Sequence, residues 1–197
     1  MKRTIFTLVA AMMIAGAIQL SAQDDLTERG SVVVDGKSTP YVVRHLPVNA
    51  FPQLPQKVVD QLEERGCTIP QTYEGYQPEN VVHGSFSGAG SNDWAVLCSV
   101  RGEVSFLIFF NDGSDEPMVL ERAKETERLQ RHPGKEWLGF NWGIDRATPT
   151  QIHDAQSGIA HRPPAPDHDA IADSVVDRRT IYHLYLQGRW TLVETVN

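Results

Sequence analysis

The chain has 197 residues, 41% of them hydrophobic, and a formal net charge of −7 at pH 7. This length suits one domain with a core of its own. An acidic surface repels phosphate backbones, so the charge argues against a nucleic-acid partner.

Residues 1–22 have the pattern of a secretory signal peptide. A positive start at Lys2 and Arg3 precedes an apolar, uncharged run at residues 5–20 and small residues at the cleavage point. A membrane anchor is the alternative, but the run is shorter than the roughly 20 residues of a spanning helix. Removing Lys2 and Arg3 leaves 16 of the 18 basic residues against 25 acidic ones, a net charge of −9. We expect a periplasmic or secreted protein, without membrane insertion after cleavage, in which residues 23–197 form a single domain.

Two β-branched runs open the remaining chain. Residues 31–35 and 41–45 flank a turn-forming stretch at residues 36–40. This arrangement predicts a β-hairpin with a longer loop.

A helix is predicted over residues 55–65. Pro55 suits the first helical position, and the apolar residues of the stretch fall on one face of a 3.6-residue repeat. Gly66 can adopt the positive φ that ends a helix. The next segment, residues 69–80, is rich in turn formers and predicts a surface loop.

The most apolar segment outside the N-terminus is a predicted hairpin in the middle of the chain. Residues 94–100 and 104–110 are its strands, and a tight turn at Arg101 and Gly102 joins them. Both faces of both strands are mostly apolar. We therefore expect this hairpin at the centre of a sheet, covered on both sides, with Trp94 buried.

The second half of the chain is less regular. Residues 118–131 mix charged residues with few apolar ones and predict either an edge strand or a short exposed helix. Residues 137–144 predict a strand interrupted by glycines, and residues 149–156 predict a short helix with Thr148 at its N-cap. A last hairpin is predicted at residues 180–194.

The two cysteines, Cys67 and Cys98, follow the predicted helix and lie in the central hairpin. An even number of cysteines in an oxidising compartment predicts one disulfide, with two buried free thiols as the alternative. The sequence as a whole predicts an α+β fold: an antiparallel sheet with one main helix in a single disulfide-stapled domain.

A glycine-rich loop at residues 84–92 leads into an Asp-Trp-Ala-Val strand that begins at Asp93. It resembles the FG-GAP/VCBS loop of integrin-like propeller blades, which binds calcium before an Asp-x-Ala-Val strand. The resemblance implies a turn of this shape with Asp93 as a candidate metal ligand. Calcium needs several oxygen ligands, usually carboxylates. The other ligand positions here hold Ser85, Ser87 and Ala89. The predicted helix, the Gly66-Cys67 pair, the run from Asp93 to Cys98 and the C-terminal hairpin together look like a family of exported bacterial proteins. That family has no assigned activity, so this second resemblance implies no reaction.

Further candidate metal ligands gather in the proline-rich segment before the last hairpin, namely His153, Asp154, His161, Asp167, His168 and Asp169. Histidine and aspartate bind metals, but the spacing matches neither H-E-x-x-H nor paired C-x-x-C motifs. The alternative is a solvated loop in which Asp167 and Asp169 cap the next element.

Familiar catalytic motifs do not occur in the sequence. Phe86 takes the serine position of a G-x-S-x-G elbow at residues 84–88, and the phosphate-binding G-x-x-x-x-G-K-[ST] pattern is missing. We therefore expect no catalytic residue and no cofactor.

Aromatic residues are the remaining candidates for a binding surface, namely Tyr73, Tyr76, Trp137 and Trp142. Exposed aromatics contact peptides or sugars, whereas buried ones pack the core. The expectation is a non-catalytic binding or interaction module for a protein, peptide or glycan ligand. The alternative is a hydrolase of cell-envelope polymer or peptide. Buried titratable pairs in a cleft would favour the hydrolase, and a shallow aromatic patch would favour the binding module.

Overall fold

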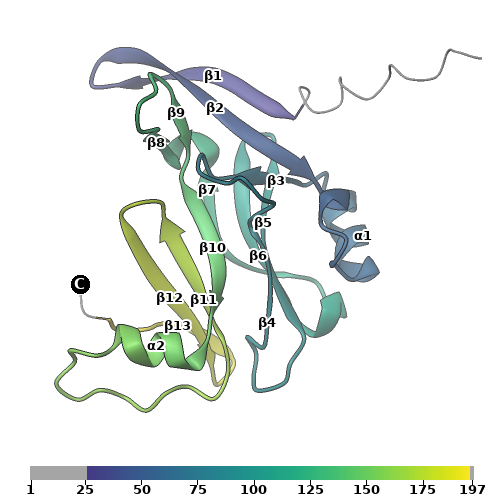
Figure 1. The fold of residues 1–197 in the computed structure, drawn as a ribbon. Helices are drawn as coiled ribbons and strands as arrows, with labels where there is room; N and C mark the ends of the chain where they lie inside the picture. The colour runs from purple at the N-terminus through teal and green to yellow at the C-terminus, as the bar shows by residue number, and fades with distance from the viewer. Residues whose placement is uncertain (1–25, 196–197) are drawn as a thin grey trace, which may run out of the picture.

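The computed structural model describes residues 26–195 (Figure 1), so the predicted signal peptide at residues 1–22 lies outside the described residues. The described chain is mostly strand, with two short α-helices. Its strands form one sheet of nine and one sheet of four. This is an α+β fold, as predicted. None of the described helices is both long and apolar enough to cross a membrane.

The larger sheet holds the first nine strands. In chain order these are β1 (Thr27–Val34), β2 (Lys37–Pro47), β3 (Thr68–Gln71), β4 (Val81–Gly84), β5 (Asp93–Val100), β6 (Glu103–Phe109), β7 (Met118–Lys124), β8 (Leu129–Arg131) and β9 (Leu138–Phe140). The hydrogen-bonded order is β7-β6-β5-β3-β2-β9-β8, with β1 added to β2 and β4 added to β5. The pair β2–β9 is parallel, so the sheet is mixed where an antiparallel sheet was predicted.

The larger sheet curls strongly. Strands β7 and β8 stand at opposite ends of its order, yet only the short 3-10 helix η3 (Glu125–Glu127) and Arg128 separate them in the chain. The two ends of the sheet must therefore come close together. Glu125 lies at this closure, where its carboxylate contacts His45 of β2 and Ser99 of β5.

The predicted central hairpin is confirmed as strands β5 and β6. Its turn residues Arg101 and Gly102 both have positive φ, 53° and 78°. Trp94 is buried on one face, with Val96 and Cys98. The opposite face carries another set of fully buried residues, and they pack against the second sheet: Ala95, Leu97, Phe106 and Ile108. Both sides of the hairpin are therefore covered, as its apolar pattern predicts.

Helix α1 (Gln56–Glu64) covers the Trp94 face. Pro55 is its extended N-cap residue and not the first helical residue, as was predicted, whereas Gly66 acts as predicted. The chain leaves the helix at Gly66, whose φ is +72°. The N–H of Gly66 donates to the carbonyl of Glu63 at 2.9 Å, and the N–H of Cys67 donates to that of Leu62 at 3.0 Å. This is the bond pattern of a Schellman ending. This helix ending places Cys67 next to Cys98, and the predicted disulfide joins them.

The second sheet has the order β10-β11-β12-β13, all antiparallel. Its strands are β10 (Trp142–Ala147), β11 (Ala170–Val175), β12 (Arg179–Leu186) and β13 (Arg189–Leu192). The last two strands are the predicted C-terminal hairpin. Helix α2 (Pro149–Ala155) is capped by Thr148 and Gln151 and packs Ile152 on the outer face of the sheet. Two further 3-10 helices are η1 (Val48–Ala50) and η2 (Asn111–Gly113).

Several predicted elements need correction. Residues 118–131 form edge strand β7 and then β8, which decides between the strand and the helix. The single strand predicted at residues 137–144 is two strands, β9 and β10, which divide at Asn141 and belong to different sheets. The predicted surface loop begins with a strand, since β3 is buried from Ile69 to Gln71 and pairs with β2. The first hairpin turns on two residues, Asp35 and Gly36, and not on a longer loop.

Candidate functional site

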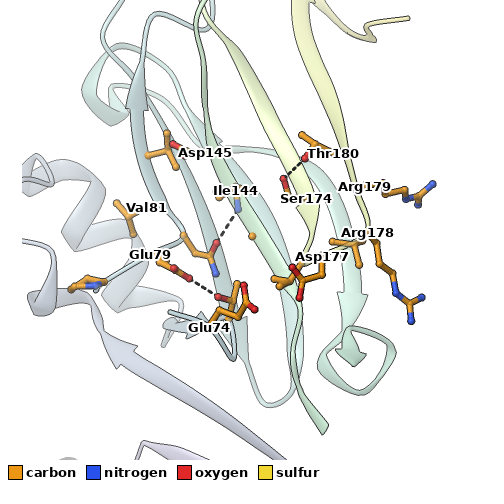
Figure 2. Close-up of a pocket in the computed structure, with 17 residues that line it drawn as sticks. Glu74, Glu79, Val81, Ile144, Asp145, Ser174, Asp177, Arg178, Arg179 and Thr180 are labelled. Atoms are coloured by element: carbon orange, nitrogen blue, oxygen red, sulfur yellow. Dashed lines mark hydrogen bonds between the residues drawn. The ribbon is translucent and has the colours of Figure 1, made fainter. Parts of the chain in front are cut away.

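A groove of about 750 Å³ lies where the two sheets meet (Figure 2). Its floor is the outer face of β10, β11 and β12. One wall is the loop at residues 72–80 with the start of β4, and the other is the turn between β11 and β12. Because segments distant in the sequence build it, only the folded chain forms this groove.

The floor is made of small and polar residues. Gly143, Ser174 and Thr180 stand opposite one another in neighbouring strands, so they share one face. The hydroxyls of Ser174 and Thr180 are 2.8 Å apart. At Gly143 a Cβ would lie 3.5 Å from Cγ2 of Thr72, so the absent side chain keeps the floor open. Helix α2 covers the same face further along the strands, where Ile152 packs with Ala147 and Ala170. The part of the face around Gly143 and Ser174 lines the groove.

Two buried polar side chains hold the loop wall. The amide nitrogen of Gln71 donates to the carbonyls of Ile69 and Glu79 at 3.1 Å each, and its oxygen accepts the N–H of Glu79 at 2.8 Å. Asn80, only 1% exposed, donates to the carbonyls of Pro70 (2.7 Å) and Trp142 (3.2 Å). Its oxygen accepts the N–H of Ile144 at 3.0 Å, also drawn in Figure 2. Asn80 therefore fastens the loop and links the two sheets beneath the groove.

The turn wall is tied to the loop wall through Gln130 of β8. The N–H of Val176 donates to the carbonyl of Asn141 at 3.0 Å. The amide of Gln130 donates to the carbonyl of Val176 (3.2 Å) and to the hydroxyl of Tyr73 (3.1 Å). Tyr73 in turn donates to Asp177 at 3.4 Å. The separation of the two walls is thus set by hydrogen bonds at this end of the groove.

The groove is acidic. Carboxylates line it from the loop, from β10 and from the turn, namely Glu74, Glu79, Asp145 and Asp177. Arg178 and Arg179 also line it, but Figure 2 shows their side chains extending away from Glu79 and Asp145. Burial, followed by the negative charges of Asp177 and Glu74, raises the pKa of Tyr73. The hydroxyl of Tyr73 therefore stays protonated at neutral pH and donates to Asp177. The acceptors that the groove offers to a ligand are the carboxylates of its lining.

The predicted aromatic residues do not form one patch. Tyr73 borders the groove, and its ring lies 5.1 Å from that of His132, which is 4.7 Å from the ring of Trp137. Tyr76 is 94% exposed. Trp142 is fully buried, and its indole N–H donates to Asp173 at 2.7 Å. The prediction of Trp142 as a binding residue is therefore corrected, since it packs the core between the sheets.

The candidate metal ligands of residues 153–169 are dispersed among structural contacts. His168 is buried, with its ring nitrogens 2.6 Å from Asp167 and 2.9 Å from the carbonyl of Tyr185. Asp169 accepts the N–H of Ser85 at 3.1 Å. The remaining candidates lie elsewhere. Asp154 is paired with Arg162, which also donates to the backbone carbonyl of His153, and His161 is exposed. Within residues 26–195 no group of three or more such side chains could hold a metal ion.

Asp93 is fully buried and bonded to the glycine-rich loop itself. One carboxylate oxygen accepts the N–H and hydroxyl of Ser87 at 2.6 and 2.7 Å and the hydroxyl of Ser91 at 2.5 Å. The other accepts the N–H of Asn111 at 3.1 Å. Serine donors thus satisfy the one carboxylate that remains of the resembled calcium loop.

Two histidine–carboxylate pairs are buried away from the groove. His45 lies 2.8 Å from Glu125, and its other ring nitrogen lies 3.2 Å from the carbonyl of Leu26. His183 lies 3.2 Å from Asp173. None of these four side chains lines the groove. A hydrolase site would need such a buried pair to line a cleft, and neither pair lines the groove.

The residues that build the groove were missed in the sequence. The best available signal was Asn80, because asparagine tolerates the positive φ of 69° that it adopts just before a strand. Gly143 was a second signal, since a glycine inside a strand has no side chain to pack and leaves room above the sheet.

Comparisons of the chain with protein-family models, curated proteins and solved structures found no match. The resemblances to FG-GAP/VCBS loops and to a family of exported bacterial proteins stay predictions.

Proposed function

We propose that this protein is an exported, non-catalytic binding module that holds a lysine- or arginine-bearing polypeptide segment in the groove over the junction of its two sheets. The observation that carries the proposal is the groove itself: about 750 Å³, with carboxylates contributed by three separate elements. Its walls are fixed by buried hydrogen bonds before any ligand arrives. Such preorganisation lowers the entropic cost of binding.

The acidic lining supports a basic ligand. Glu74, Asp145 and Asp177 are exposed, so they attract a cation without first breaking a buried ion pair. Of the described residues that line the groove, none is aromatic. Stacking on a sugar ring therefore has no partner there, which favours a polypeptide over a glycan.

Two further observations support the remaining parts of the proposal. The Cys67–Cys98 disulfide supports export, because disulfides persist in oxidising compartments. The pairs His45–Glu125 and His183–Asp173 lie outside the groove, which supports binding over hydrolysis.

The test compares two peptides of equal length, one alternating lysine with serine and one alternating glutamate with serine. We expect the purified protein to bind only the lysine peptide, with an affinity that falls as salt rises. Glu74→Gln with Asp145→Asn should weaken binding roughly three- to tenfold, as expected for two solvent-exposed ion pairs.

The matched control is Glu63→Gln with Glu64→Gln on exposed positions of α1, which removes the same charge far from the groove. Calorimetry should give this control the wild-type affinity. Equal weakening in both variants would reduce the effect to net charge. Binding of oligosaccharides in place of the lysine peptide would overturn the choice of ligand.

A further inference from the structure

We propose that the protein forms a symmetric dimer, in which β1 of one copy pairs antiparallel with β1 of a second copy. This interface is separate from the groove and does not depend on it. It uses the edge of β1 that β2 leaves free. In Figure 1, β1 lies on the outer side of β2, and β2 is its one partner among the described strands.

The free edge follows from the register of the first hairpin. The N–H of His45 donates to the carbonyl of Leu26 at 2.9 Å, so this is a hydrogen-bonded pair. Such pairs alternate along an antiparallel ladder. The even-numbered residues of β1 therefore bond to β2, and the odd-numbered ones direct their N–H and C=O groups outward. These outward residues are Thr27, Arg29, Ser31 and Val33.

The edge of β1 has little protection against pairing. The strand is eight residues long, with an unbroken register and no lysine or proline. Its end is β-branched, and Val33 is 75% exposed. The other outer strands of the described chain are shorter or interrupted. Strand β7 has a bulge and a terminal Lys124, and β4, β8 and β13 have three or four residues. Asn80 already bonds the backbone of β10. An exposed, regular edge of this kind is a template for another strand.

A second copy fits this edge in one register particularly well. Pairing Thr27 with Val33, and Arg29 with Ser31, satisfies every outward residue of both copies. The two-fold axis then passes between the two Gly30 residues. This pair is not hydrogen-bonded, so its Cα atoms approach to about 4.5 Å. A self-complementary patch of this kind defines an isologous dimer.

Side chains agree with the same register. Glu28 would face Val32 of the second copy and Arg29 would face Ser31, so no like charges meet. The ring of Tyr41 covers Gly30, where a Cβ would lie only 2.6 Å from the tyrosine oxygen. The hydroxyl of Tyr41 is held by Glu28 at 2.8 Å. The aromatic ring therefore supplies the side-chain surface that Gly30 lacks on its own face.

Sedimentation velocity of the purified protein over a range of concentrations tests the dimer. We expect the wild type to reach the mass of two chains. Ser31→Pro should remain monomeric, because it removes an outward N–H without touching the ladder to β2. Ser38→Pro is the matched control, since it makes the same change on the side of the hairpin that faces away from β1, and it should still dimerise.

Charge substitutions at Ser31 test the register without altering the backbone. Ser31→Glu should tighten the dimer by pairing with Arg29, and Ser31→Lys should weaken it, each by roughly three- to tenfold for two symmetric contacts. The same changes at Ser38 should have no effect. A monomer at every concentration would overturn the proposal. So would a dimer whose affinity ignores the charge at residue 31.

Discussion

Trp94 shows what the central strand contributes to stability. It is 6% exposed and packs in the core beneath α1, and its indole N–H donates to Asp112 at 3.1 Å. Truncation would leave a large cavity and an unpaired acceptor. We predict that Trp94→Ala lowers the free energy of unfolding by about 3–5 kcal/mol.

Chemical denaturation measures this loss. Trp94→Phe serves as a control that keeps most of the volume but removes the indole N–H, and it should lose less stability than Trp94→Ala. A denaturation midpoint for Trp94→Ala within error of wild type would mean that Trp94 is a surface platform and not part of the core.

Glu125 makes stability depend on pH. Burial acts to raise the pKa of Glu125, but the hydrogen bond and charge of His45, together with the hydroxyl of Ser99, outweigh it and bring the pKa below its ordinary 4.5. The unfolded chain then takes up this proton more readily than the folded one. The contribution of Glu125 is fully present above pH 4.5 and is lost as the pH falls through the folded pKa.

We therefore predict that stability falls below pH 4.5 and that Glu125→Gln makes this fall shallower. Urea denaturation between pH 3 and pH 7, in steps of about half a unit, measures both. Asp60→Asn on the exposed side of α1 is a control that removes one carboxylate without this pair. An equally steep fall in Glu125→Gln would show that protonation of Glu125 does not cause the loss of stability at low pH.

The disulfide acts on two elements, the end of α1 and strand β5. It closes a sequence separation of 31 residues. The loop-entropy model assigns such a link roughly 3–4 kcal/mol. We predict that Cys67→Ala with Cys98→Ala lowers the free energy of unfolding by that amount and leaves the fold intact.

Denaturation of the double variant and of the reduced wild type should give the same midpoint. Alkylation of the unfolded, non-reduced wild type should modify no cysteine. Detection of two alkylated cysteines by mass spectrometry would contradict the Cys67–Cys98 disulfide.

Elements with local signals could be predicted from the sequence. The chain leaves helix α1 through Gly66, the central hairpin turns at Arg101-Gly102, and α2 begins after its N-cap Thr148, each with a residue suited to its backbone. Strand β3 could not, because its turn-forming residues are extended by pairing with β2, distant in the sequence. The division of β9 from β10 at Asn141 depends on which sheet each strand joins, and nothing local encodes it.

The candidate site was less predictable than the fold. Aromatic residues are the obvious binding candidates in a sequence, yet Trp142 lies in the core. Tyr73 does not line the groove and is linked to it by the hydrogen bond from its hydroxyl to Asp177. The groove depends instead on Gln71 and Asn80, whose roles arise when β3, β4 and β10 meet. Polar residues of this kind look like surface positions until the fold buries them.

At the level of the whole molecule, two sheets share a core, and the groove opens over the line along which they meet. The clearest measurement is a titration of isotope-labelled protein with the lysine–serine peptide, followed by amide chemical shifts in NMR. We predict that shifts concentrate on Gly143, Ser174, Thr180 and Glu79, with β1 and α1 unchanged. Shifts confined to Tyr76 and Trp137, or no shifts at millimolar peptide, would contradict a binding role for the groove.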